Sequence, residues 1–130
     1  MTTDELVHYW VDTSNDDYVV MENLFDNGHH AWSLFLGHLV VEKLLKAYYV
    51  KNAGVDCPRI HDLLKIATLA GLEVTDSQRI FLDEVTTFNI LARYSDYKRR
   101  FSETLDREFT ALYAGKIKEF RQWLLQQIAR

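Results

Sequence analysis

The sequence predicts an all-α protein, an antiparallel up-and-down bundle of four to five helices. Three observations carry this prediction: apolar residues recur at helical spacing, hydrophobic residues make up 48% of the chain, and its 130 residues include only one proline and five glycines. A β-sandwich or barrel would need turn residues every ~8–12 positions. Because one domain usually takes ~100–200 residues, we expect residues 1–130 to form a single helical domain.

Composition excludes several other classes of protein. A hydrophobic content of 48% with 13% aromatic residues excludes a disordered chain. Cys57 is the only cysteine and cannot form a disulfide within the chain, so we expect a reducing compartment, the cytoplasm. No apolar run reaches the ~18 residues of a membrane span, and the acidic N-terminal segment lacks a signal peptide's basic region. We therefore expect no membrane contact.

The net charge of −4 is unevenly distributed along the chain. Residues 1–28 contain seven acidic residues and no lysine or arginine, whereas residues 93–130 contain nine basic and five acidic residues. The last third can therefore hold a site for a polyanion. The overall acidity argues against indiscriminate binding of nucleic acid, since affinity grows with the number of phosphates neutralised.

Two long helices are expected in the first half of the chain. The first begins at Thr3, whose side chain can cap it, and ends at Asn27-Gly28. Ser14 and Asp17 lie on its inner face together with five apolar residues: Leu6, Trp10, Met21, Leu24 and Phe25. The second helix covers about 30–52 and is apolar almost all round, which is typical of the central helix of a bundle.

Three more helices are expected after the Cys57-Pro58 turn. A short one covers about 61–70 and is stopped by Gly71. Thr75-Asp76-Ser77-Gln78 has the capping-box pattern and begins the fourth, which has a core stripe of Phe81, Val85, Phe88 and Ala92. The fifth covers about 102–129, can bend at Gly115, and has on its inner face Leu105, Phe109, Leu112, Phe120, Trp123 and Leu124. Short links make neighbouring helices antiparallel.

His38, Glu42 and Lys46 form one polar stripe on the second helix, because residues four apart share a helix face. Two interpretations stay open. The stripe is either a polar line facing a cleft or a solvated edge in which Glu42 and Lys46 pair. The spacing of His29, His30 and His38 does not fit a zinc site, so we expect no metal. We expect no cofactor either.

His61-Asp62 and Asp17 are further polar candidates. His61 can move a proton or contact a phosphate near neutral pH, but capping of the short helix is the favoured interpretation. Asp17 lies on an apolar face, where an unpaired carboxylate is costly. We therefore expect either a cationic partner for Asp17, with Arg93 and Lys46 as the candidates, or a rotation of the helix that exposes Asp17.

Residues 90–101 contain the most informative candidate for a binding site. Arg93 presents a rigid fork of donors that suits a carboxylate or a phosphate, and its link to the core stripe through Ala92 predicts a specific partner. Tyr94 and Tyr97 can stack on a base, and Lys98-Arg99-Arg100 adds a cationic cluster. Two interpretations of this cluster have equal weight. The cluster either binds a ligand, or it is a surface turn whose basic residues are solvated or pair with the acidic first helix.

Three short motifs in this order resemble the HEPN domain, named for higher eukaryotes and prokaryotes nucleotide-binding. They are Val41-Glu42-Lys43-Leu44-Leu45-Lys46-Ala47, His61-Asp62-Leu63-Leu64 and Ala92-Arg93-Tyr94-Ser95-Asp96. Trp10 and Asp17 also resemble the first helix of this family, and Trp123 resembles the last. The resemblance covers nearly the whole chain. One difference is Ser95, where the family usually has proline.

The resemblance implies a bundle that commonly forms a homodimer and is often encoded beside a minimal nucleotidyltransferase, in many cases as a toxin–antitoxin pair. HEPN ribonucleases are similar in carrying an arginine followed, after four to six residues, by a histidine near the dimer axis; the pair cleaves RNA without metal. Here Lys98, Arg99 and Arg100 occupy the positions of that histidine. An ammonium or guanidinium group keeps its proton near pH 7 and is a poor proton carrier.

Three functions stay open. The favoured one is a non-catalytic or weakly catalytic dimeric subunit that binds nucleotide or RNA and pairs with a minimal nucleotidyltransferase. Its candidate binding residues are Arg93, Asp96, Tyr94, His61, Lys98, Arg99 and Arg100, supported by His38, Glu42, Lys46 and Asp17. The alternatives are a plain bundle for protein–protein interaction and a metal-independent ribonuclease toxin with His61 as an atypical base.

Overall fold

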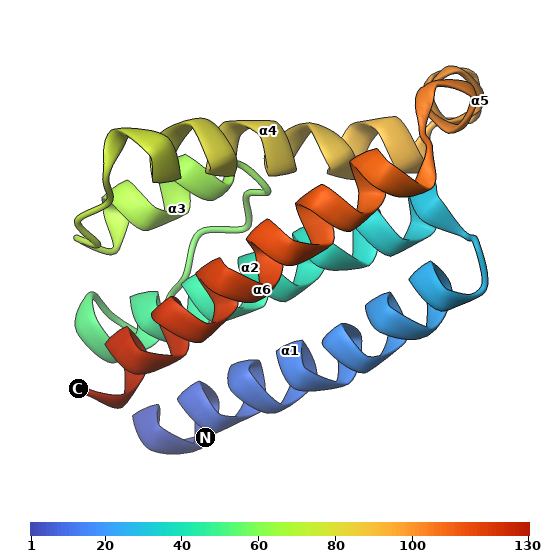
Figure 1. Cartoon of the computed structure of the whole chain (residues 1–130). Coiled ribbons are helices and arrows are strands. Elements are labelled where there is room, and N and C mark those ends of the chain that lie inside the picture. Colours follow the sequence, from blue (N-terminus) through green and yellow to red (C-terminus); the bar gives the residue numbers. More distant parts are fainter.

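The computed structural model describes residues 1–130 except the side chains of Ser95, Lys98 and Thr104. Over these residues the chain forms six α-helices and no strand (Figure 1). The helices are α1 (Thr3–Asp26), α2 (His30–Asn52), α3 (Leu63–Leu69), α4 (Asp76–Arg93), α5 (Ser95–Thr104) and α6 (Arg107–Ala129). The predicted all-α bundle is confirmed, with one helix more than the five expected along the chain.

Helices α1 and α2 form an antiparallel pair joined by a tight turn (Figure 1). Gly28 has a φ of 79° in this turn, a left-handed conformation that favours glycine. The predicted cap of α1 is wrong by one residue: the Thr2 hydroxyl oxygen accepts a hydrogen bond from the Glu5 amide at 3.1 Å. Thr3 is instead the first helical residue, because Thr2 is the residue with the extended backbone of an N-cap.

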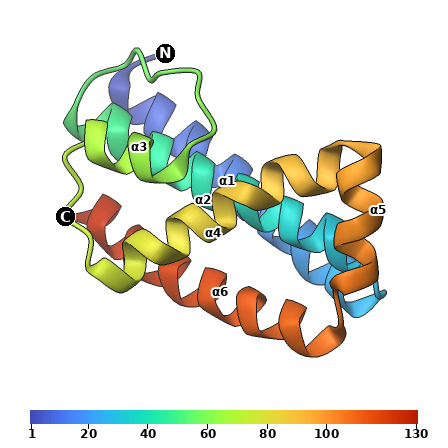
Figure 2. The ribbon, with the colours of Figure 1, turned by 90° about the horizontal axis from the view of Figure 1, so that it is seen from above.

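Helix α2 lies at the centre of the bundle, between α1 on one side and α4 and α6 on the other (Figures 1 and 2). Several of its apolar side chains have no exposed surface, among them Leu34, Val40, Val41, Leu44 and Leu45. A Cβ on Gly37 would lie 2.5 Å from Ile117 Cδ1 of α6 and 3.2 Å from Met21 Sδ of α1. Gly37 therefore lets both neighbouring helices approach α2 closely.

Helices α3 and α4 cover α2 on the side opposite α1 (Figure 1). The short helix begins later than expected, at Leu63, because the Asp62 carboxylate caps it by accepting from the Lys65 amide at 3.1 Å. The predicted capping box of α4 is confirmed, with hydrogen bonds in both directions between Thr75 and Gln78. The predicted core stripe of α4 is buried as well.

Helix α5 crosses the end of the bundle between α4 and α6 (Figure 2). The backbone is extended at Tyr94 and again at Leu105, so residues 95–104 form a helix of their own. The last helix begins at Arg107 and not near residue 102, because the Asp106 carboxylate caps it by accepting from the Phe109 amide at 2.7 Å.

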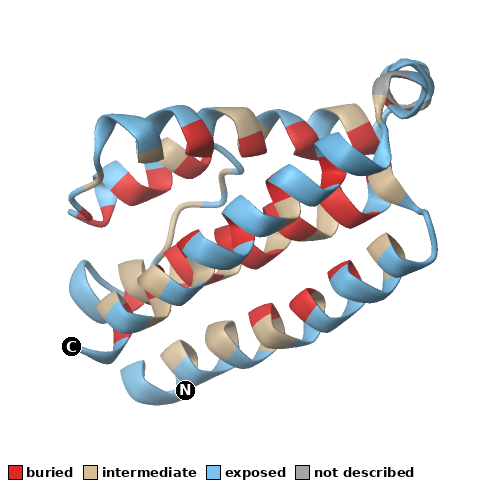
Figure 3. Cartoon of the chain, viewed as in Figure 1, coloured by how far each residue is buried: buried red, intermediate tan, exposed pale blue. Residues whose placement is uncertain are grey.

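The inner face of α6 differs from the predicted stripe. Phe109 and Leu112 are 37% and 55% exposed, so their assignment to the core is wrong. The buried residues of α6 are Thr110, Tyr113, Ile117, Phe120, Leu124 and Ile128. Burial on the helices is concentrated on the faces turned toward α2, whereas the outer face of α1 is exposed (Figure 3).

None of the helices that the described residues form is long and apolar enough to cross a membrane. The cytoplasmic location stays a prediction.

Candidate functional site

A buried carboxylate on α2 is the centre of the first polar site. The side chain of Glu42 is only 5% exposed. Its Oε1 accepts a hydrogen bond from His61 Nδ1 at 2.7 Å, and its Oε2 pairs with Lys46 Nζ at 3.4 Å. The interpretation of the stripe as a solvated edge is therefore wrong, although the expected pair between Glu42 and Lys46 is present.

His38, one turn before Glu42, has no exposed surface. Its Nε2 donates to the backbone carbonyl oxygen of His61 at 3.1 Å, since a carbonyl can only accept. Its Nδ1 is buried and has no hydrogen-bond partner among the described residues. Burial lowers the pKa of His38 below its ordinary value of 6.5, against the opposing effects of the His61 carbonyl and of Glu42. His38 is therefore a neutral side chain that fixes the backbone of His61.

The buried His38 predicts a loss of stability in mild acid. Because the unfolded chain binds a proton at a higher pH than the folded chain, the contribution of His38 is complete above pH 6.5 and falls as the pH drops further. The loss is at most about 1.4 kcal/mol for each pH unit. Urea unfolding of the wild type and of His38→Gln between pH 7.5 and 5 measures it. The prediction fails if both free energies change equally with pH.

His61 lies in the extended segment between α2 and α3, and its side chain is 54% exposed. The expectation that it caps the short helix is wrong, because its ring turns back to Glu42 and the adjacent Asp62 is the cap. With Nδ1 donating to the carboxylate, Nε2 carries the lone pair and has no protein partner among the described residues. A half-exposed imidazole oriented by a buried carboxylate has the arrangement of a general base.

Two lysines of α2, Lys43 and Lys46, contact α1. Lys46 Nζ lies 5.3 Å from the ring centre of Trp10, a cation–π contact. Asp17 pairs with Lys43 Nζ at 2.6 Å, so the predicted partners Arg93 and Lys46 are both wrong. Lys43 lies on the side of α2 that faces Asp17, whereas Lys46 pairs with Glu42 and Arg93 belongs to α4.

A second polar surface lies where α4 meets α5. Arg93 is the last residue of α4 and is exposed; its Nη1 donates a long hydrogen bond of 3.5 Å to Asn89 Oδ1, while Asn89 is only 8% exposed. Tyr94 and Tyr97 are 57% and 52% exposed. A specific partner was expected for Arg93. Among the described residues, Arg93 instead makes one weak contact, to Asn89 of its own helix. The guanidinium group keeps most of its donors available for a ligand.

Helix α5 places further charges beside Arg93. Asp96 and Arg100 are exposed, and Arg99 Nε lies 3.7 Å from Glu103 Oε1 in a surface pair. The side chain of Lys98, also a predicted binding residue, lies outside the described residues. The cluster is therefore part of a helix and not of a turn, but Arg99 and Arg100 are exposed, as the alternative of solvated basic residues expects. Its phosphate-binding role stays a prediction.

The family comparison matches this chain to the HEPN domain over residues 7–127. The chain belongs to the HEPN domain family. The resemblance seen in the sequence is thereby confirmed, and it connects the chain with a nucleotide- or RNA-related role in general. No curated protein and no solved structure matches the chain closely enough to be counted as similar.

One face of α4 in this HEPN chain carries both Arg93 and a contact to the segment that follows His61. Thr86, Asn89 and Arg93 share one face, since residues three and seven apart lie together on a helix. The Thr86 hydroxyl accepts from the Leu63 amide at 3.1 Å, two residues after His61. Arg93 is seven residues beyond Thr86, about 10 Å along the axis at 1.5 Å per residue. Neither Arg93 nor Asp17 has a described hydrogen bond or ion pair to the Glu42 cluster.

Some residues of the HEPN site could not be singled out from the sequence. Asn89 contacts Arg93, and Thr86 holds the start of α3. Neither could be singled out, because single polar residues on an amphipathic helix carry no signal of their own. Their spacing from Arg93 is the only sequence feature that points to them. Among the described side chains, no group of three or more His, Cys, Asp or Glu is arranged to hold a metal ion.

Proposed function

We propose that this chain is a non-catalytic or weakly catalytic HEPN subunit that forms a homodimer, binds nucleotide or RNA, and pairs with a minimal nucleotidyltransferase in a toxin–antitoxin-like system. The observation that carries the proposal is the exposed guanidinium group of Arg93, whose one hydrogen bond among the described residues is the 3.5 Å contact to Asn89. A planar guanidinium group binds phosphate oxygens through two parallel hydrogen bonds.

The surroundings of Arg93 support a nucleotide or RNA as its ligand. Tyr94 and Tyr97 are both more than half exposed and offer rings on which bases can stack. Arg100 adds positive charge, and the Asp96 carboxylate in the first turn of α5 can accept hydrogen bonds from ribose hydroxyls. Phosphate, base and sugar each have a complementary group on this surface.

Replacement of Arg93 tests the proposed site. We expect Arg93→Ala to weaken binding of a fluorescently labelled single-stranded RNA by about ten- to a hundredfold, since one charged contact contributes ~1.5–3 kcal/mol. The dependence of log affinity on log salt should become flatter by about 0.7. Fluorescence anisotropy between 50 and 200 mM salt measures both. Arg79→Ala, on the exposed surface of the same helix, is the matched control and should bind as the wild type does. Equal binding by Arg93→Ala, or no binding of RNA and ATP by the wild type, would contradict the proposal.

The proposed pairing has its own test. Co-expression with a minimal nucleotidyltransferase encoded beside this chain should yield a complex that survives affinity purification and gel filtration. Separate elution of the two proteins would argue against the pairing, and would leave the proposed RNA site to the anisotropy experiment.

A specific observation favours a second candidate, a metal-independent ribonuclease. The 2.7 Å hydrogen bond between Glu42 and His61 orients an imidazole that can take a proton from a ribose 2′-hydroxyl. The attack of that hydroxyl on the adjacent phosphate breaks the bond to the 5′-oxygen, which takes up a proton from water and leaves as a hydroxyl, and the product is a 2′,3′-cyclic phosphate. Incubation of RNA with the purified protein, followed by analysis of the ends, tests this candidate. Intact RNA would exclude it and leave the binding function in place.

A further inference from the structure

A groove between α4 and α6 is lined by none of the residues of the two polar sites. Its volume is about 490 Å³, and its walls include Ile80 and Phe81 of α4 and Phe120 and Trp123 of α6. Clefts of ~300–1,000 Å³ that are lined by apolar and aromatic side chains with a few polar groups are typical binding sites for small molecules. The groove has both the size and the lining of such a site.

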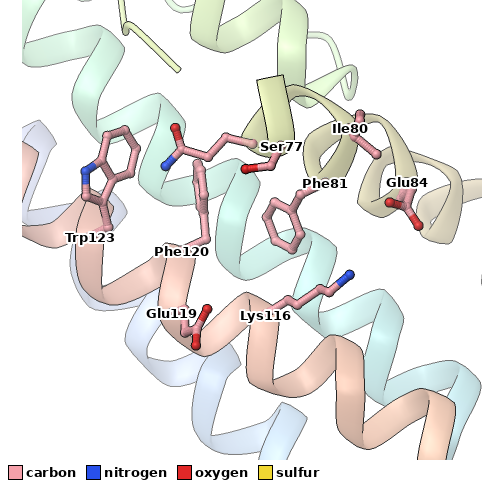
Figure 4. Close-up of a pocket in the computed structure, with 9 residues that line it drawn as sticks. Ser77, Ile80, Phe81, Glu84, Lys116, Glu119, Phe120 and Trp123 are labelled. Atoms are coloured by element: carbon pink, nitrogen blue, oxygen red, sulfur yellow. The ribbon is translucent and has the colours of Figure 1, made fainter. Parts of the chain in front are cut away.

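The floor of the groove is aromatic and held by the core. The ring centres of Phe81 and Phe120 lie 5.2 Å apart, and those of Phe120 and Trp123 lie 5.4 Å apart (Figure 4). Phe81 and Phe120 belong to the core, and Trp123 is partly buried and packs against it. At the edge of the groove, Ile80 is 62% exposed. The apolar surface of the groove is therefore preformed.

The free charges at the rim are negative. Glu84 of α4 and Glu119 of α6 line the groove, and among the described residues neither carboxylate has a hydrogen bond or an ion pair. Lys116 also lines the groove, but its Nζ lies 4.9 Å from the ring centre of Tyr113, a cation–π contact of its own.

The two carboxylates lie at different places along the groove. In the close-up the Lys116 side chain extends toward the end where Glu84 lies, whereas Glu119 lies toward the other end, on the helix that carries Trp123 (Figure 4). Glu119 and Trp123 are four residues apart, so they share one face of α6. Glu119 is therefore a carboxylate beside the aromatic floor that no described cation balances.

We propose that the α4–α6 groove binds an organic amine in its protonated form, with an aromatic or otherwise apolar body. The body covers Phe81, Phe120 and Ile80, and the ammonium group lies between the Glu119 carboxylate and the Trp123 ring. Tryptophan is the side chain whose ring attracts a cation most strongly. A neutral ligand would leave Glu119 unpaired, and an anionic ligand would be repelled by it.

Three probes of similar size separate the charge of the ligand from its shape. They are phenethylamine as the cation, phenethyl alcohol as its neutral analogue and phenylacetate as the anion. Binding is followed by two-dimensional NMR of the nitrogen-labelled protein, through the indole N–H signal of Trp123, which Trp123→Phe identifies. We expect the amine to shift this signal saturably and the alcohol to bind about fivefold more weakly, because a partly exposed ion pair changes an equilibrium by up to about fivefold. Phenylacetate should bind more weakly still.

Replacement of Glu119 provides the matched comparison. Glu119→Gln keeps the shape of the side chain and should weaken binding of the amine about fivefold without changing the binding of the alcohol. Glu108→Gln removes an exposed carboxylate from the same helix outside the groove, and should bind the amine as the wild type does. Arg93 lies nine residues beyond Glu84 on α4, about 14 Å along the helix axis, so the amine site and the proposed RNA surface can be tested one at a time.

Each contrary result would overturn the proposal in its own way. A Trp123 signal that no probe shifts saturably would show that the groove is not a site for these ligands. Tighter binding of phenylacetate than of phenethylamine would mean that Lys116 selects the ligand and that an anion is the occupant. An unchanged affinity of Glu119→Gln for the amine, or an equal loss in Glu108→Gln, would remove the specific role of the Glu119 carboxylate. Circular dichroism of each variant confirms that it is folded.

Discussion

Replacement of Glu42 by alanine is expected to lower the free energy of unfolding by about 3–5 kcal/mol. Removal of one partner of a buried ion pair is this costly because the remaining charge is then buried without an opposite charge. The Lys46 side chain is only 13% exposed, and His61 Nδ1 would lose its acceptor. The segment that connects α2 to α3 would also lose a contact that holds it on α2. Urea unfolding followed by circular dichroism at pH 7.5 measures the change.

Two further variants separate the charge of Glu42 from its volume. Glu42→Gln keeps the shape and an acceptor for His61, so it should cost less than the alanine variant. Asp83→Ala, an exposed carboxylate on α4, should change the stability by no more than about 0.5 kcal/mol. An alanine variant at Glu42 as stable as Asp83→Ala would mean that the cluster contributes nothing to the fold.

Local signals in the sequence were sufficient for much of the fold. The almost uniformly apolar segment 30–52 identified the central helix, because only a helix surrounded by others can bury every face. The capping box at Thr75 identified the start of α4, since both of its hydrogen bonds lie within four residues. Such features depend on neighbouring residues alone and can be read without knowing the rest of the structure.

Features that depend on distant residues were not predictable. The stripe of His38, Glu42 and Lys46 was visible, but its burial depends on the segment that carries His61, which is 19 residues beyond Glu42. The partner of Asp17 depends on which side of α2 faces α1. Helix α5 was missed although Asp106 is a good N-cap, because residues 95–104 contain only two apolar residues, Tyr97 and Phe101, which are too few to reveal a separate helix.

If the chain cleaves RNA, His61→Ala is expected to slow the cleavage at least 100-fold, within the ~10²–10⁴-fold contribution of a general base. The half-exposed ring is held by Glu42 at 2.7 Å, so its Nε2 is the atom that would accept the proton. Added imidazole should restore part of the rate to His61→Ala, because a small molecule can occupy the space of the lost ring. A purely structural role of His61 would not respond to imidazole.

The controls distinguish the base from the surrounding fold. His8→Ala removes an exposed histidine of α1 and should cleave at the wild-type rate. Glu42→Gln keeps an acceptor for Nδ1 but no longer stabilises the protonated ring, so it should slow cleavage by a smaller factor than His61→Ala. A fully active His61→Ala protein would show that another group moves the proton. The buried Glu42 would then serve only to hold the α2–α3 segment.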